Sequence, residues 1–194
     1  EMLVGAGENA VNLTERNLKV QLADAFKSIP TEGALRYVFG DGSRQVVVFS
    51  DPDCPYCQAL EFMFHANKDN LNATVLIVPY PIDSLHPEAD AKSRHLLCTK
   101  DPEAAWKDWM QTSAAAVGRN QTASWKDWSA KYPATPGCAR ADLVDKVKEY
   151  GKTYGFNQTP ILMFSNGMPF LGLLDRTELE KAWEYVRTGQ VPVQ

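Results

Sequence analysis

Val46-Val47-Val48-Phe49-Ser50-Asp51-Pro52-Asp53-Cys54-Pro55-Tyr56-Cys57 joins an apolar run to a closely spaced pair of cysteines. The run from Val46 to Phe49 is apolar on both faces, which is typical of a central strand buried on both sides. After the cysteines, apolar residues recur at helical spacing to about Asn70. The sequence therefore predicts that Cys54 and Cys57 lie where a strand passes into a helix.

Further strands are predicted on both sides of this stretch. Residues 34–39 and 45–50 flank the turn residues Gly40-Asp41-Gly42-Ser43 and predict a hairpin or two neighbouring strands. Residues 73–78 form the next apolar run, and a strand, helix, strand order implies a parallel crossover. Downstream, residues 160–165 and 168–173 flank Asn166-Gly167, which is a strong signal for a hairpin.

Helical patterns occupy the rest of the chain. Residues 1–32 contain an N-terminal helix that starts near Asn12 and ends at Pro30. Residues 33–194 form the main domain, with an all-helical insertion at about 84–155 where no strand pattern is found. A final helix is expected over Asp175 to Arg187 because its apolar residues fall on one stripe. The fold class is therefore α/β with an inserted helical subdomain.

Composition excludes several classes of function. The 194 residues carry 20 Lys and Arg against 24 Asp and Glu, a net charge of -4, so no basic surface for nucleic acid is expected. No apolar run approaches the eighteen or so residues that span a bilayer. The chain starts at Glu1 without a basic and apolar leader, so we expect a signal peptide to be absent from it.

The cysteine pair carries the predicted chemistry. The simplest pairing of the four cysteines joins Cys54 to Cys57 and Cys98 to Cys138. The start of a helix has partial positive charge and unpaired N–H groups, which favour a thiolate on Cys54. Cys54 would then attack a foreign disulfide and Cys57 would resolve the mixed disulfide. Pro55 suits the first helical turn because it has no N–H to leave unpaired.

Two other interpretations of this region were considered. Asp51 and Asp53 would oppose a thiolate if they faced it, and we expect them to cap the helix or face solvent. The cysteine pair could also be half of a zinc site, completed by the distant cysteines or by the three histidines, His65, His86 and His95. The strand before the pair and the helix after it favour redox chemistry, so we expect no metal and no organic cofactor.

A proline at the start of a strand is unusual, and Thr159-Pro160 supplies one. Together with residues 47–57, the turn Phe164-Ser165-Asn166-Gly167, the segment Asn12-Leu13-Thr14 and the isolated Cys98 and Cys138, this step resembles the bacterial periplasmic DsbC/DsbG disulfide isomerase family. The resemblance covers most of the chain. It implies a thioredoxin-like fold in which residues 1–32 are a linker helix and residues 33–194 the catalytic domain.

The resemblance also implies roles for single residues. Cys54 would be the exposed attacking thiol and Cys57 the buried resolving thiol. A cis Thr159-Pro160 step would lie beside them and contact the substrate backbone, and Pro55 and Tyr56 would contact the substrate too. Cys98 and Cys138 would form a structural disulfide within the helical insertion.

The expected function is thiol:disulfide interchange in the periplasm, by isomerising or reducing wrong disulfides in secreted proteins. The resemblance implies unfolded or wrongly bonded secreted proteins as substrates and a membrane-bound reductant of the DsbD type. A homodimer is expected only if a dimerisation domain precedes this chain. The alternatives are a net dithiol oxidase and a non-catalytic chaperone or binding module with a structural cysteine pair.

Overall fold

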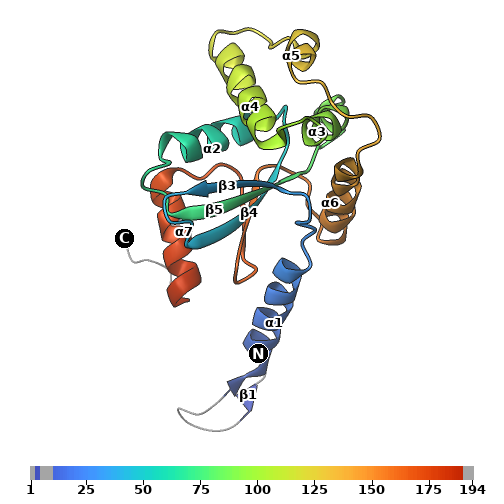
Figure 1. Cartoon of the computed structure of the whole chain (residues 1–194). Helices are drawn as coiled ribbons and strands as arrows, with labels where there is room; N and C mark the ends of the chain where they lie inside the picture. The colour runs from blue at the N-terminus through green and yellow to red at the C-terminus, as the bar shows by residue number, and fades with distance from the viewer. Residues whose placement is uncertain (1–2, 5–10, 190–194) are drawn as a thin grey trace.

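A computed structural model describes residues 3–4 and 11–189, with side chains from residue 17 onward. A small two-stranded sheet and the first helix precede the main sheet (Figure 1). In chain order the elements are β1 (Leu3–Val4), β2 (Val11–Asn12), α1 (Leu13–Lys27), β3 (Leu35–Phe39), β4 (Arg44–Ser50), α2 (Pro55–Ala66), β5 (Ala73–Pro79), α3 (Ala89–Leu97), α4 (Pro102–Gly118), α5 (Trp125–Lys131), the 3₁₀ turn η2 (Ala139–Ala141), α6 (Asp142–Thr153), β6 (Ile161–Phe164), β7 (Pro169–Leu171) and α7 (Arg176–Thr188).

The main sheet has five strands in the order β3-β5-β4-β6-β7. Strands β4 and β5 are parallel, as the predicted crossover through α2 requires, and the other neighbours are antiparallel. Strand β4 lies in the middle, and its residues from Val46 to Phe49 are buried. The central position predicted for this run is therefore confirmed.

One prediction about the sheet is wrong, because β3 and β4 are not neighbours. Strand β5 lies between them and pairs with both. The turn between β3 and β4 passes over the start of β5 instead of closing a hairpin. There the side-chain oxygen of Asn72 accepts the N–H of Asp41 at 3.3 Å, and Arg44 donates its N–H to the Asn72 carbonyl at 3.2 Å.

The predicted hairpin at Asn166-Gly167 is confirmed by the antiparallel pairing of β6 and β7. Gly167 has a φ of 81°, in the region that favours glycine. A Cβ atom on Gly167 would lie 1.9 Å from the carbonyl oxygen of Leu22 on α1. The glycine therefore allows the turn to pack directly against the first helix.

Helices α6 and α7 cover opposite faces of the sheet. Phe164 lies across from Val46 in the sheet register, and its ring contacts that of Trp183 on α7 at 5.9 Å. Phe49 points to the other face because side chains alternate along a strand. Its ring stacks on Tyr150 of α6 at 5.5 Å.

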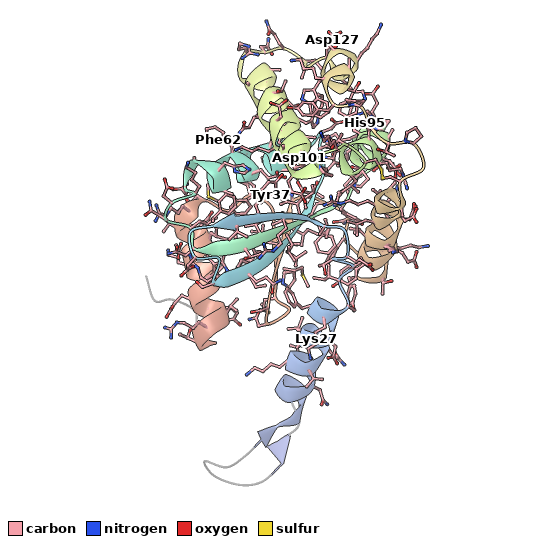
Figure 2. The ribbon with its side chains drawn as sticks, in the orientation of Figure 1. Lys27, Tyr37, Phe62, His95, Asp101 and Asp127 are labelled. Carbon is pink, nitrogen blue, oxygen red and sulfur yellow. A yellow bond between two sulfur atoms is a disulfide. The ribbon has the colours of Figure 1, made fainter. Side chains whose placement is uncertain are left out.

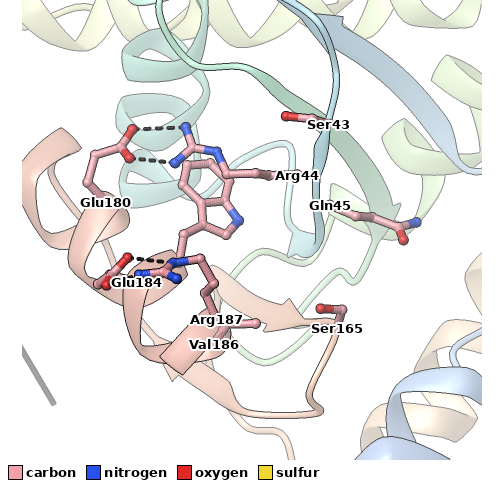
Figure 3. A pocket seen from close by; sticks show the side chains of 9 residues that line it. Ser43, Arg44, Gln45, Ser165, Glu180, Glu184, Val186 and Arg187 are labelled. Carbon is pink, nitrogen blue, oxygen red and sulfur yellow. Dashed lines mark hydrogen bonds and ion pairs between the residues drawn. The ribbon is translucent and has the colours of Figure 1, made fainter. Parts of the chain in front are cut away.

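An ion pair also fastens α7 to the central strand. Arg44 at the start of β4 donates to both carboxylate oxygens of Glu180, at 2.5 and 3.0 Å (Figure 3). The same guanidinium lies over the ring of Trp183, 3.9 Å from its centre. Helix α7 begins at a capping box formed by Asp175 and Glu178, so the last predicted helix is confirmed.

The segment between β5 and β6 contains four helices and η2. In it the structure shows no strand beyond an isolated bridge between Thr99 and Ala134. The insertion predicted at about 84–155 falls within this segment. In Figure 1, α4 and α5 stand above the sheet. Nowhere in residues 3–4 and 11–189 is a helix long and apolar enough to cross a membrane.

Helix α1 projects away from the sheet, with the β1–β2 pair at its far end (Figure 1). Leu18 and Val20 are both more than half exposed on it, whereas Ala25 and Ile29 are buried near the body. The hydroxyl of Tyr150 donates to the carbonyl of Ala25 at 2.9 Å. Only the last turns of the predicted N-terminal helix therefore belong to the core.

Candidate active site

The two neighbouring cysteines lie at the predicted junction of strand and helix. Cys54 is the N-cap of α2, and Pro55 is its first residue. The N–H of Cys54 donates to the carbonyl of Asp51 at 3.1 Å, which closes the turn after β4. Both Cys54 and Cys57 are free thiols, so the disulfide predicted between them is not formed in this structure. The two cysteines thus follow the central strand β4 and lie at the start of α2.

The two thiols have opposite acidities. Hydrogen bonding from the Cys57 thiol lowers the pKa of Cys54 to about 6, against the opposing effect of burial. The N–H groups of Cys57 and Tyr56 and the hydroxyl of Thr159 lower the pKa of Cys54 further. Burial raises the pKa of Cys57 well above its ordinary value, and its bond to Cys54 adds to this. At neutral pH the negative charge therefore belongs on Cys54.

The exposure of Cys54 differs from expectation. Only 5% of its surface is exposed, and Cys57 is fully buried. The sulfur of Cys54 lies 3.5 Å from the carbonyl oxygen of Thr159, so the loop before β6 covers it. Tyr56, in contrast, is 62% exposed beside it. Cys54 is therefore the less buried residue of the pair, but it does not lie on an open surface.

Thr159 and Pro160 lie next to the cysteine pair although they are far away in sequence. The bond between them is cis, as predicted. Pro160 is buried and precedes β6, the strand that pairs with β4. The structure therefore brings Cys54, Cys57, Thr159 and Pro160 together in one site.

Asp51 neither faces solvent nor caps α2, because its carboxylate bonds to groups outside that helix, so the expectation for this residue is wrong. Its side chain is fully buried. Its oxygens accept the N–H of Asp53 at 2.8 Å and of Ile82 at 2.9 Å, and one of them lies 2.9 Å from Nδ1 of His86. The N–H of Asp51 contacts the sulfur of Cys57 at 3.4 Å. Asp51 therefore connects the cysteine turn to the loop after β5.

Asp53 is neutralised by a lysine from the helical insertion. The amino group of Lys92 on α3 lies 2.9 Å from both carboxylate oxygens of Asp53. It also lies over the rings of Trp109 and Trp125, at 5.2 and 5.7 Å from their centres. The negative charge of Asp53 beside Cys54 is therefore paired with Lys92, and this ion pair is largely buried.

Comparison with known proteins agrees with this geometry. A family model described as a thioredoxin-like domain matches residues 31–187. The crystal structure of a disulfide interchange protein from Neisseria gonorrhoeae is 31% identical, with a TM-score of 0.61, and the match covers 84% of this chain and 99% of that one. The chain belongs to the thioredoxin-like disulfide interchange proteins. The predicted thioredoxin-like fold is confirmed.

The curated proteins that this chain matches are longer than the chain itself. A probable thiol:disulfide interchange protein DsbC from Bordetella pertussis is 35% identical over 155 residues, which are 80% of this chain and 47% of the relative. The DsbC of Escherichia coli K12 is 25% identical over 162 residues, 84% of this chain and 58% of the relative. The chain thus spans about half the length of the curated relatives that it matches.

Glu61 is a further acidic residue near the cysteine pair, and the sequence patterns did not indicate a role for it. It lies on α2, one turn after Cys57, and is buried. The hydroxyl of Ser50 donates to it at 2.8 Å, and the indole N–H of Trp106 on α4 donates to both its oxygens. Burial raises the pKa of Glu61 to about 7, although these bonds oppose the shift. Its charge therefore changes in the neutral range.

Cys98 and Cys138 form a disulfide, as expected. It joins the end of α3 to the residue before η2 and closes a separation of 40 residues within the helical insertion. Both half-cystines belong to that insertion, whereas Cys54 and Cys57 lie at the start of α2. The disulfide therefore joins two parts of the helical insertion.

The three histidines considered as metal ligands have separate surroundings. His65 packs against the rings of Tyr37 and Phe39, and burial lowers the pKa of His65 to about 4. His86 pairs with Asp51. His95, labelled in Figure 2, contacts the carbonyl of Tyr132 through Nε2 at 2.7 Å. Within the part of the chain that the structure describes, no three His, Cys, Asp or Glu residues gather as a metal site.

Proposed function

We propose that this chain isomerises or reduces wrong disulfides in secreted proteins, with Cys54 as the attacking and Cys57 as the resolving residue. The observation that carries the proposal is the opposite acidity of the two thiols: the pKa of Cys54 is lowered to about 6, while that of the buried Cys57 is raised. A thiolate is the nucleophile in disulfide exchange. The names of the curated relatives support the same chemistry.

The reaction follows from the positions of the two sulfurs. The Cys54 thiolate attacks one sulfur of a substrate disulfide, forms a mixed disulfide and releases the other substrate sulfur as a thiolate. If that thiolate attacks a second disulfide of the substrate, a new substrate disulfide forms and another substrate thiolate is released. When this last thiolate attacks the substrate sulfur of the mixed disulfide, Cys54 leaves as a thiolate and the substrate is isomerised without net electron transfer. If Cys57 loses its proton and attacks Cys54, the substrate leaves as a dithiol and the protein is oxidised.

The substrate would lie against the residues that surround Cys54. We assign substrate contacts to Pro55 and Tyr56, which are exposed, and to Thr159 and Pro160, which lie beside the sulfur. An extended substrate backbone could donate an N–H to the Thr159 carbonyl, which lies 3.5 Å from the sulfur of Cys54. These four residues are the substrate-binding set that we propose.

A net oxidase is the second candidate, and the low pKa of Cys54 favours it. Stabilising the thiolate stabilises the reduced form of the pair and makes its disulfide more oxidising. Equilibration with glutathione gives the reduction potential of the Cys54–Cys57 pair, which distinguishes an oxidase from an isomerase or reductase. A reduction potential near roughly -120 mV indicates an oxidase, and one well below about -200 mV indicates a reductant.

We assign the protein to the periplasm, with a membrane-bound reductant of the DsbD type as its electron donor. A reductase or isomerase must be returned to its dithiol form, and periplasmic chemistry is otherwise oxidising. The homodimer implied by the resemblance would require a domain ahead of α1. Light scattering on this chain tests whether it pairs without one.

A single substitution tests the proposed function. Cys54→Ala is expected to abolish the reduction of insulin and the refolding of a scrambled multi-disulfide protein. Ala at this position leaves the fold unchanged, which a thermal unfolding curve verifies. Retained activity would remove Cys54 from the mechanism and favour a binding module with a structural cysteine pair.

A further inference from the structure

Lys92 on α3 is a buried cation beside the turn that leads into the cysteine pair. Only 9% of its side chain is exposed. Its amino group lies 2.9 Å from both carboxylate oxygens of Asp53 and 3.1 Å from an oxygen of Glu88. The side chain of Glu88 is 77% exposed, whereas that of Asp53 is 18% exposed. The contact with Asp53 is therefore the one that solvent screens least.

Two tryptophans of the helical insertion hold Lys92 over this turn. Its amino group lies 5.2 Å from the ring centre of Trp109 on α4 and 5.7 Å from that of Trp125 on α5. The indole N–H of Trp109 also donates to the carbonyl of Pro52 at 3.0 Å. Figure 1 shows α3 and α4 on the same side of the sheet as α2. The insertion thus contacts both residues that directly precede Cys54.

The other charged groups near the cysteines have partners of their own. The carboxylate of Asp51 lies beside His86, and that of Glu61 accepts hydrogen bonds from β4 and α4. In the described part of the chain, the hollow between α2, α3 and α4 is lined by no charged residue except Asp53 and Lys92. Lys92 is therefore the cation that balances the charge of Asp53 at this place.

Stability alone does not account for an ion pair at this place. Burying an ammonium and a carboxylate removes both from water, and that cost often equals or exceeds their attraction, so apolar residues of similar size are frequently as stable. The pair has a second consequence here, because Asp53 directly precedes Cys54. A carboxylate without a counter-charge beside a thiol disfavours the thiolate, and a nearby cation cancels that effect.

We propose that Lys92 is a positioning residue for disulfide exchange, which acts through Asp53 to keep the sulfur of Cys54 in its thiolate form. This inference rests on the proposed function, in which the Cys54 thiolate attacks the substrate. The N–H groups at the start of α2 favour the thiolate from within the helix. Lys92 adds a full positive charge from the helical insertion, so the insertion takes part in setting the reactivity of Cys54.

The test separates the charge of Lys92 from its packing. Lys92→Met keeps a long side chain and removes the charge, whereas Lys92→Arg keeps the charge. Asp53→Asn removes the opposite charge, and the double variant Asp53→Asn, Lys92→Met removes both. Lys148→Met is the matched control, because Lys148 also pairs with two aspartates but lies on α6. The rate of alkylation of Cys54 by iodoacetamide is measured against pH for each reduced protein, and the pair is equilibrated with glutathione.

Lys92→Met should raise the midpoint of alkylation by roughly one pH unit, because it leaves the Asp53 carboxylate unbalanced beside Cys54. Its equilibrium constant with glutathione at about pH 8 should change by roughly tenfold, which makes the potential about 30 mV more negative because the thiolate is less stabilised. Asp53→Asn should lower the midpoint. The double variant, Lys92→Arg and Lys148→Met should all stay near the wild-type midpoint, and thermal unfolding verifies that each variant is folded.

Three results would overturn the proposal. A wild-type midpoint in folded Lys92→Met would show that the lysine does not act on Cys54. An equal rise in Lys92→Met and in the double variant would assign the effect to lost packing, since the second substitution restores neutrality. If Lys92→Met does not fold, an unchanged midpoint in Asp53→Asn overturns the proposal instead. A wild type that is alkylated at Cys54 as expected but exchanges no disulfide would refute the proposed function and not the charge effect.

Discussion

The carboxylate of Asp51 lies 2.9 Å from Nδ1 of His86, a residue 35 positions further along the chain. The same carboxylate accepts the N–H of Ile82, while the carbonyl of Asp51 accepts the N–H of Cys54. One residue thus holds the loop after β5 through its side chain and the cysteine turn through its backbone. The position of Cys54 therefore depends on a buried aspartate outside the four-residue cysteine motif.

Asp51→Ala should destabilise the protein strongly, because it leaves the N–H of Ile82 and the ring of His86 without their buried partner. We expect the free energy of unfolding, measured in urea, to fall by about 3 kcal/mol. Asp83→Ala is the matched control. Asp83 is 56% exposed and pairs with Lys148 on the surface, so its loss should cost less than about 1 kcal/mol. Equal losses in the two variants would contradict the role given to Asp51.

Glu61 should make stability depend on pH. Burial raises its pKa from 4.5 to about 7, so the folded state binds a proton more tightly than the unfolded state between these values. The free energy of unfolding therefore falls as pH rises through this window. Between about pH 5 and about pH 8, wild type should lose roughly 2.5 kcal/mol more than Glu61→Gln in urea unfolding.

The control for this experiment is Glu149→Gln, a substitution of an exposed glutamate on α6. This variant should keep the pH dependence of wild type. The assignment to Glu61 would be wrong if wild type and Glu61→Gln lost the same free energy across the window.

The disulfide between Cys98 and Cys138 should contribute stability without contributing to exchange. Closing a loop of 40 residues stabilises the folded state by about 4 kcal/mol in the chain-entropy model. The double variant Cys98→Ala, Cys138→Ala should lose about that much in urea, yet still react with oxidised glutathione when folded. Loss of exchange in the folded double variant would place these cysteines in the reaction.

Thr159 should tune the acidity of the attacking thiol. Its hydroxyl is one of the groups that lower the pKa of Cys54. Thr159→Val keeps the shape of the side chain and removes that hydroxyl. The midpoint of the pH profile of alkylation at Cys54 should rise by up to roughly one pH unit, since one hydrogen bond is worth about 1 kcal/mol. An unchanged midpoint would show that the hydroxyl does not act on Cys54.

Much of the fold could be predicted from local patterns. The doubly apolar run of β4, the cysteines at its end and the Asn166-Gly167 turn each have a signature within a few residues. The cis bond at Pro160 was implied by the family resemblance, and the pairing of Cys98 with Cys138 was the simplest one open to four cysteines; the structure shows both. For the central strand, the cysteine turn and the hairpin, a local preference decides the outcome.

What could not be predicted depends on contacts between distant segments. Strand β5 lies between β3 and β4 because it pairs with both, and nothing in the turn at residues 40–43 indicates this. The partner of Asp51 and the buried environment of Glu61 likewise come from other elements of the fold. The limited exposure of Cys54 follows from the loop at Thr159, which only the tertiary structure places over it.

The most direct test of the account is the rate at which iodoacetamide alkylates the reduced protein as a function of pH, with the modified cysteine mapped by mass spectrometry. The account predicts that Cys54 alone reacts in the native state, with a midpoint near pH 6. Cys57 should react only after unfolding, because it is fully buried. A midpoint at the ordinary thiol value of about 8.5, or equal labelling of both cysteines, would contradict it.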